Sequence, residues 1–317
     1  APAPAPASAP KAEPIVLKAI SFLPESNART IVYRKWLDLI NERAKGELVF
    51  DYIGGPEVIA YKEQPQAIKN GVVDITFSGA SAWKGLVPEA RMLALSLLTW
   101  EEERKVGAEE LLRKHFAKSN VYWVGRGDPK QNPKNFSIYL NKKISTVDDL
   151  KGIKLSAAGT YVDAMAKALG MSMTVIKAGD AYSALDTGMV DAYAYSLEGA
   201  RSYSLQEVVP YVLDHPLYLS NTVFPMNLDS WNKLPPHLQK LVMDVYTEFA
   251  PTLIKASAQG LVDAKKVFQD AGVEFISFSP ADEEKFISIS YAAEAQKYLD
   301  ELPDTASEYL KLVGAIK

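Results

Sequence analysis

Apolar and polar residues alternate along the chain in two periods, one typical of strands and one typical of amphipathic helices. Residues 15–21 (IVLKAIS), 47–53 (ELVFDYI) and 72–79 (VVDITFSG) have the short apolar runs of strands. The segments between them, residues 25–44 and 61–69, have the spacing of helices. Because strands that alternate with helices are typical of parallel sheets, the pattern predicts an α/β fold.

The alternation continues through the second half of the chain. Further strands are expected at residues 121–127, 136–141, 153–157 and 171–176, and further helices at residues 101–117, 160–169, 178–187, 281–299 and 305–314. Residues 235–270 predict one long helix, which could cross between two lobes. Pro251 lies inside it and predicts a break or a kink.

An eight-residue pattern occurs twice. Residues 67–74 (AIKNGVVD) and 184–191 (ALDTGMVD) both read as a helix end, a capping glycine and the start of a buried strand. The two strands end at Ser78–Gly79 and Tyr195–Ser196, and ligands of open α/β sheets bind beyond such ends. We interpret the pattern as a repeat of two lobes that face a common cleft; the alternative is a chance recurrence of a common helix–cap–strand pattern.

Composition and charge narrow the class of protein. The chain has 317 residues, 48% of them hydrophobic, which fits two lobes or one large domain. A net charge of −4 without long charged runs gives no basic patch for nucleic acid or an anionic membrane. No cysteine is present, which excludes disulfides and thiolate chemistry. The most apolar stretch, residues 86–100, contains Glu89 and Arg91 and is too short to span a bilayer.

The chain begins with an alternating Ala-Pro segment. Residues 1–14 (APAPAPASAPKAEP) favour extended polyproline II, so we expect a linker or a processed N-terminus outside the fold. A frayed terminus is the alternative. No basic segment followed by an apolar one opens the chain, so we expect that any signal peptide has been removed.

Motifs for catalysis or metal binding are missing from the sequence. His115, His215 and His237 are far apart and lack a metal-binding spacing. Neither G-x-S-x-G nor a Gly-rich phosphate-binding motif occurs. We therefore expect no enzyme activity, no cofactor and no metal, although an enzyme that uses a carboxylate outside known motifs stays open as an alternative.

Several segments resemble the periplasmic solute-binding subunits of tripartite ATP-independent periplasmic (TRAP) transporters, the DctP-like family. They are TVDDLKGIKLSAAG (146–159), AYSALDTGMVDA (181–192), SWNKLPPHLQKLVMDV (230–245), GGPEVI (54–59) and QPQAIKNGVVDITFSG (64–79). The blocks occur in the order of the family, and the resemblance covers residues 15–317.

The resemblance implies two α/β lobes around an interlobe cleft, joined by crossing strands and a long helix. The expected division is residues 15–135 plus 224–262 for the first lobe and 136–223 plus 263–317 for the second. It also implies a periplasmic protein, expected to be a monomer, that encloses a small organic acid when the lobes close. The acid would then pass to the membrane subunits of a TRAP permease. A subunit that senses a ligand for a signalling partner is an alternative that the sequence leaves open.

The chain departs from this family at the positions that hold the ligand. Ser156 stands where the family has the arginine that binds a carboxylate, and Phe136 matches a second arginine. Phe22 matches an asparagine, and Ala194 and Tyr195 stand where metal-assisted members have Glu-Trp. We therefore expect a more apolar ligand than usual, an aromatic or other hydrophobic carboxylate. A conventional sugar acid or C4-dicarboxylate held in an unusual way is the alternative.

The candidate ligand-binding residues fall into three kinds. Rings expected at the cleft are Phe22, Trp83, Phe136, Tyr161, Tyr193, Tyr195 and Phe224, with ordinary strand packing as the alternative. Ser78, Gly79, Ser156 and Asn221 are expected as polar contacts. Arg126 ends a strand near the hinge and is the candidate counter-charge, or else a solvated loop arginine. Arg201 and backbone amides near 159–161 are weaker alternatives.

Overall fold

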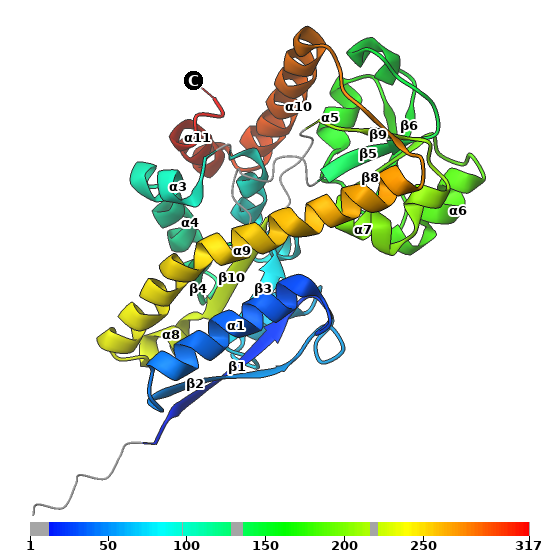
Figure 1. The fold of residues 1–317 in the computed structure, drawn as a ribbon. Coiled ribbons are helices and arrows are strands. Elements are labelled where there is room, and N and C mark those ends of the chain that lie inside the picture. Colours follow the sequence, from blue (N-terminus) through cyan, green and yellow to red (C-terminus); the bar gives the residue numbers. More distant parts are fainter. Residues whose placement is uncertain (1–12, 97, 128–135, 216–220, 317) are drawn as a thin grey trace, which may run out of the picture.

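The chain folds around two β-sheets that lie apart and are covered by helices (Figure 1). This computed structural model describes residues 13–96, 98–127, 136–215 and 221–316, and the Ala-Pro segment up to residue 12 lies outside them. The first sheet has the order β2 (Leu48–Gly54), β1 (Ile15–Ser21), β3 (Ile75–Gly79), β10 (Thr222–Asn227) and β4 (Val121–Arg126). The second has the order β11 (Glu274–Ile276), β9 (Tyr211–Leu213), β5 (Phe136–Leu140), β8 (Ala192–Ser196), β6 (Lys154–Ala157) and β7 (Ser172–Val175). The predicted α/β class with two lobes is confirmed.

Strand directions differ from the expectation of parallel sheets. Strand β1 is parallel to β2 and β3, and β6 is parallel to β7 and β8. In contrast, β10 is antiparallel to both β3 and β4, and β5 is antiparallel to β8 and β9. Both exceptions follow a passage of the chain from one sheet to the other, so no helical crossover within the sheet sets their direction.

The helices cover the faces of both sheets. They are α1 (Ala28–Arg43), α2 (Gln64–Lys69), α3 (Trp100–Val106), α4 (Ala108–Ala117), α5 (Asp163–Ala168), α6 (Ala181–Asp186), α7 (Leu197–Ser202), α8 (Leu228–Lys233), α9 (Pro236–Asp270), α10 (Pro280–Glu301) and α11 (Pro303–Leu312). The single helix expected over residues 101–117 is wrong in one respect, because Gly107 adopts a φ of +83° and separates α3 from α4. Such left-handed backbone ends a helix and favours glycine.

Helix α9 joins the two lobes. It runs without interruption through Pro251, packs against α1 on the first lobe and reaches α7 on the second (Figure 1). The predicted long helix is therefore confirmed, and of the break or kink predicted at Pro251 the break does not occur. Packing on both lobes stabilises the helix on each side of the hydrogen bond that Pro251 cannot make.

The repeated pattern has the same structure in both lobes. Its two glycines adopt φ angles of +69° and +68°. Oδ2 of Asp74 then accepts a hydrogen bond of 2.6 Å from the amide of Lys18 on β1, and Oδ2 of Asp191 accepts one of 2.9 Å from the amide of Lys154 on β6. Each aspartate thus ties the start of one strand to the neighbouring strand, which supports a repeat over a chance recurrence.

The C-terminal helices bridge the lobes. Phe286, near the start of α10, packs in the core of the second lobe, while Tyr298, near its end, packs with Trp83 and Trp123 of the first. Tyr309 of α11 lies in the same first-lobe core. This packing differs from the expected grouping of residues 263–317 with the second lobe, because the buried stripe of α10 changes partner along its length.

Candidate functional site

Aromatic side chains of the first lobe gather where β1 and β3 end. The ring of Phe22, which follows β1, lies 5.4 Å from that of Tyr61 and 5.3 Å from that of Phe77, measured between centroids. The hydroxyls of Tyr61 and Ser81 share a hydrogen bond of 3.1 Å. A Cβ added at Gly79 would lie 2.5 Å from the Tyr61 hydroxyl, so glycine at the end of β3 makes room for this ring.

A second group of rings lies where β5 begins and β8 ends. The ring centroid of Phe136 is 5.2 Å from that of Tyr161 and 6.2 Å from that of Tyr195, and Tyr203 lies 6.1 Å beyond Tyr195. Edge-to-face geometry describes both contacts of Phe136, as is typical of aromatic pairs. The hydroxyl of Tyr161 donates to the carbonyl of Ala194, 3.1 Å away, and is thereby fixed at the edge of the sheet.

The two groups of rings lie on opposite lobes and are close enough to interact electrostatically. Burial, with smaller contributions from the hydroxyls of Tyr203 and, from the other lobe, Tyr61, raises the pKa of Tyr195 to about 12. An ion pair also crosses between the lobes, since a guanidinium nitrogen of Arg29 on α1 lies 3.3 Å from a carboxylate oxygen of Glu198 on α7. We call this region the interlobe site. Its members are Phe22, Arg29, Tyr61, Phe136, Tyr161, Tyr195 and Glu198.

Three expected rings lie in the protein interior instead. Phe224 is fully buried among the rings around Trp36 in the first lobe. Trp83 is also fully buried and donates through Nε1 to Ser78 Oγ at 3.2 Å. Tyr193 is buried in the second lobe, where its hydroxyl donates to the Ile176 carbonyl at 3.0 Å. Their surroundings are those of the alternative considered for these residues, strand packing.

Ser156 occupies a buried place on β6. Its side chain is fully buried, and Ser156 is in register with Tyr193 on the neighbouring β8. Among the residues that the structure describes, its Oγ has no hydrogen-bond partner. The position therefore supplies no charge to a ligand acid.

Arg126 is buried at the junction of the lobes and is not a solvated loop residue. Its Nη1 donates to Asn221 Oδ1 at 2.9 Å and its Nη2 to the Leu98 carbonyl at 2.8 Å. Its Nε lies 3.1 Å from a carboxylate oxygen of Glu103, which is equally buried. Burial raises the pKa of Glu103, and the charge of Arg126 opposes this rise. A ligand acid at Arg126 would have to compete with this carboxylate.

Arg29 was not among the residues expected from the sequence. It lies in the first turn of α1, with its guanidinium 6.0 Å from the ring centroid of Phe22. The sequence contained one signal for Arg29, its position just after the N-cap Asn27. A cation in the first turn of a helix opposes the helix dipole, so an arginine there is unusual. Its partner Glu198 is distant in sequence, so the pair was not predictable from spacing.

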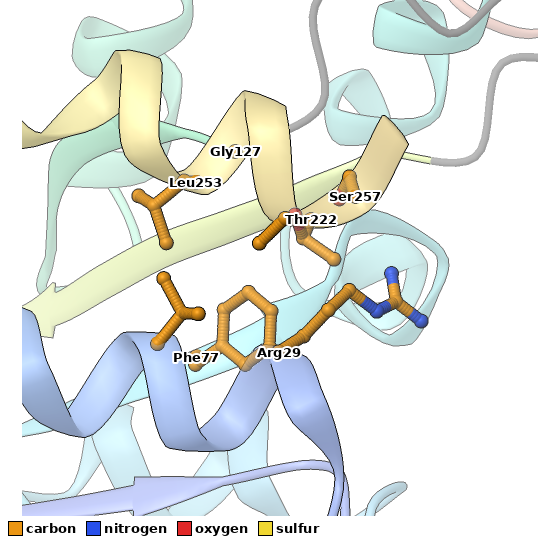
Figure 2. A pocket seen from close by; sticks show the side chains of 8 residues that line it. Arg29, Phe77, Gly127, Thr222, Leu253 and Ser257 are labelled. Atoms are coloured by element: carbon orange, nitrogen blue, oxygen red, sulfur yellow. The ribbon is translucent and has the colours of Figure 1, made fainter. Parts of the chain in front are cut away.

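A small cavity adjoins Arg29. It has a volume of about 10 Å³ between α1, α9 and the first sheet, with Phe77, Gly127, Thr222 and Leu253 in its wall. Figure 2 shows that the guanidinium of Arg29 points away from Phe77 and Leu253. Pockets for organic ligands are larger, about 300 to 1,000 Å³, so this cavity suits solvent. A wider hollow of about 410 Å³ between α9 and the start of α3 is lined by none of the expected residues.

Metal and membrane features were sought in the same part of the chain. Among residues 13–96, 98–127, 136–215 and 221–316, no group of three His, Asp or Glu side chains is placed to hold a metal ion. Over those ranges, no helix combines the length and the apolar character needed to cross a bilayer.

Comparison with known proteins identifies relatives over most of the chain. The profile of the DctP family, described as bacterial extracellular solute-binding protein, family 7, matches residues 21–299. The 2,3-diketo-L-gulonate-binding periplasmic protein of Escherichia coli is 23% identical over 267 residues, which cover 80% of this chain and 78% of the relative. A solute-binding protein of Albidiferax ferrireducens is 22% identical over 286 residues, 84% of this chain and 80% of the relative.

Solved structures share the fold. A TRAP periplasmic solute-binding protein from Desulfovibrio salexigens, with bound orotic acid, has a TM-score of 0.80 at 22% identity and covers 94% of this chain and 97% of its own. A TRAP periplasmic solute-binding protein from Ochrobactrum anthropi, with its C-terminus in the ligand-binding pocket, has a TM-score of 0.84 at 16% identity and covers 95% of both chains.

Proposed function

Since this chain belongs to family 7 of the bacterial extracellular solute-binding proteins, the solute-binding subunits of TRAP transporters, we propose that it binds a planar, ring-bearing organic acid in the interlobe site. The family serves transport, and its members deliver their ligands from the periplasm to TRAP permease subunits. We expect this chain to do so as a monomer.

The observation that carries the choice of ligand is the replacement of charge by rings. Phe136 stands at a position expected for arginine and makes edge contacts with Tyr161 and Tyr195. Phe22 and Tyr61 present rings from the other lobe. Aromatic rings on both lobes favour a planar ligand, because an aromatic ligand can make stacked and edge-to-face contacts with them. The orotic acid bound by the Desulfovibrio salexigens protein is a ligand of this class.

A conventional acid is the second candidate. The Escherichia coli relative is named for 2,3-diketo-L-gulonate, and the structure from Sulfitobacter sp. holds β-D-galacturonate. Several tyrosine hydroxyls could hydrogen-bond such a sugar acid. A sensing role for a signalling partner would use the same site, and loss of uptake in a strain that lacks the protein would favour transport over sensing.

A thermal-shift screen tests the class of ligand. Orotate and benzoate should raise the melting temperature, whereas malonate and glucuronate should not. A ligand at 100 times its Kd adds about 2.7 kcal/mol to the apparent stability of the native state. Tyr195→Ala should reduce the shift by removing a ring of the site. Tyr182→Ala is the matched control, because the Tyr182 hydroxyl contacts Glu207 on the second lobe and not the rings of the site. A melt shifted by glucuronate but by neither ring acid would overturn the proposal.

A further inference from the structure

We propose that Arg29 is the cation that binds the ligand's acid group, and that Glu198 holds this guanidinium until the acid displaces it. This inference rests on the function proposed above. It assigns recognition of the ligand's negative charge to a residue of α1. This residue lies away from the strand positions of Ser156 and Phe136.

The other candidate residues are poorly suited to bind the ligand's acid group. Ser156 is neutral and fully buried. Arg126 is only 2% exposed and its charge faces the Glu103 carboxylate at 3.1 Å. Removing Arg126 from this carboxylate would leave a buried charge without a partner, which costs several kcal/mol. An acid ligand therefore gains little at Arg126.

The pair of Arg29 and Glu198 is much easier to exchange. Its side chains are 18% and 30% exposed, and the nearest charged atoms are 3.3 Å apart. Ion pairs in contact with water contribute little to stability. A ligand carboxylate can offer two oxygens to the planar guanidinium, and this arrangement is the stronger one. Glu198 keeps its charge after the exchange, and its 30% exposure allows water to solvate the displaced carboxylate.

The position of the pair suits a ring-bearing acid. Arg29 lies against the ring of Phe22, and Glu198 starts α7 directly after the strand that carries Tyr195. A ligand ring placed between Phe22 and Tyr195 would thus direct its acid group toward Arg29. The first turn of α1 contains no acidic residue, so an added anion there would also interact favourably with the helix dipole.

Helix α9 provides the space that Glu198 occupies. A Cβ added at Gly260 would lie 2.3 Å from Glu198 Oε1 and 3.2 Å from its Cδ. Because these atoms are the end of a flexible side chain, an added methyl group would displace the carboxylate. Gly260→Ala should move the Glu198 carboxylate while the charges of the site stay the same.

The experiment compares acids with neutral relatives of the same shape, by calorimetric titration of the full chain. The pairs are orotate with uracil and benzoate with benzamide. Arg29→Gln should weaken binding of the acids by about 10- to 100-fold, the range expected for a lost charged hydrogen bond, and leave the neutral compounds unchanged. Arg29→Lys should retain part of the affinity, because it keeps the charge but loses the fork.

The opposite change is expected at the partner. Glu198→Gln should strengthen acid binding about two- to fivefold, because the Glu198 carboxylate no longer competes with the ligand acid. Gly260→Ala should act in the same direction. Arg34→Gln is the matched control, since Arg34 is on the same helix and pairs with the exposed Glu25. It should leave binding unchanged.

The outcomes separate this inference from the proposed function. If wild type binds an acid and Arg29→Gln binds it equally well, the role of Arg29 is disproved while the ligand class stands. If Glu198→Gln weakens binding as Arg29→Gln does, the pair is an interlobe contact and not a site of exchange. If wild type binds neither acid, both proposals fail.

Discussion

At the scale of single residues, three protein partners stabilise the buried charge of Arg126. The guanidinium connects the end of β4 with Asn221, which precedes β10, and with Glu103 on α3. The chain leaves the first lobe after β4 and re-enters it at Asn221. Such a network stabilises the junction as long as every member is present.

Replacing Arg126 should therefore be costly. Arg126→Met should lower the free energy of unfolding by about 3 to 5 kcal/mol, because it leaves the Glu103 carboxylate buried without a cation. Urea denaturation at neutral pH measures the change. The double variant with Glu103→Leu should recover part of the loss, since neither charge is then left unpaired. Arg34→Met, which breaks an exposed ion pair, should cost less than about 1 kcal/mol. Similar effects of the two arginine variants would contradict the buried network.

The sequence predicts where residues lie along strands better than which way they point. The rings of Phe136 and Tyr195 were expected together at strand ends, and they are in contact. Trp83 and Phe224 were expected beside them but are fully buried. Trp83 follows β3 on a short 3-10 helix and packs in the first-lobe core. Phe224 lies on β10, and because both faces of the first sheet are covered, an apolar side chain on either face packs in a core. Arg29 was missed because its role depends on a partner from the other lobe.

At the scale of elements, the contact between β4 and α9 depends on a glycine. A Cβ added at Gly125 would lie 2.2 Å from the ring of Tyr246, a residue of α9. The hydroxyl of Tyr246 accepts from the Arg126 amide at 2.8 Å and donates to the Arg126 carbonyl at 2.6 Å. The ring therefore lies across the end of the strand, and only a residue without a side chain permits this contact.

Gly125→Ala should disrupt this contact. We expect a loss of about 1 to 3 kcal/mol in the free energy of unfolding, the usual cost of adding a methylene to a packed core. Gly85→Ala is the control, because no atom lies within 4 Å of a Cβ added there. Urea denaturation of both variants is the measurement. Equal stabilities would show that Tyr246 can move aside at no cost and would disprove the close packing.

The sequence specifies the elements more completely than their directions. Amphipathic spacing predicted α1 and the full length of α9, and the repeated pattern predicted both strand starts. Directions were not predictable, because β5 and β10 enter their sheets from the other lobe. Their pairing depends on how the lobes are joined, and that information lies in contacts between distant parts of the chain.

At the scale of the whole molecule, α10 is a second helical connection between the lobes. It packs against α5 in the second lobe and against α11, whose Tyr309 ring belongs to the first-lobe core. Glu294 faces α5, where one carboxylate oxygen accepts from the Met165 amide at 3.2 Å. Within the described part of the chain, its other oxygen has no hydrogen-bond partner. A half-satisfied carboxylate thus lies buried in the contact between α10 and α5.

This carboxylate should make the stability of the molecule depend on pH. Burial raises the pKa of Glu294 from 4.5 to about 7; Lys297 and Arg91 oppose the rise and Asp163 adds to it. A carboxyl whose pKa is higher in the folded state stabilises that state fully below its unfolded value of about 4.5, and this contribution is lost as pH rises through 7. At about 1.36 kcal/mol per unit, the shift corresponds to about 2 to 4 kcal/mol.

Glu294→Gln should remove this dependence, because the amide is neutral at every pH. Relative to the variant, the free energy of unfolding of wild type should fall by about 2 to 4 kcal/mol between pH 4.5 and pH 8, as measured by urea denaturation across that range. Glu301→Gln is the control on the same helix, since Glu301 is more exposed and pairs with Arg91. Parallel profiles for wild type and Glu294→Gln would mean that the carboxylate is ionised and solvated at neutral pH. In that case α10 would contact α5 less closely than the hydrogen bond from Met165 indicates, while Phe286 and Tyr298 would still pack α10 against both lobes.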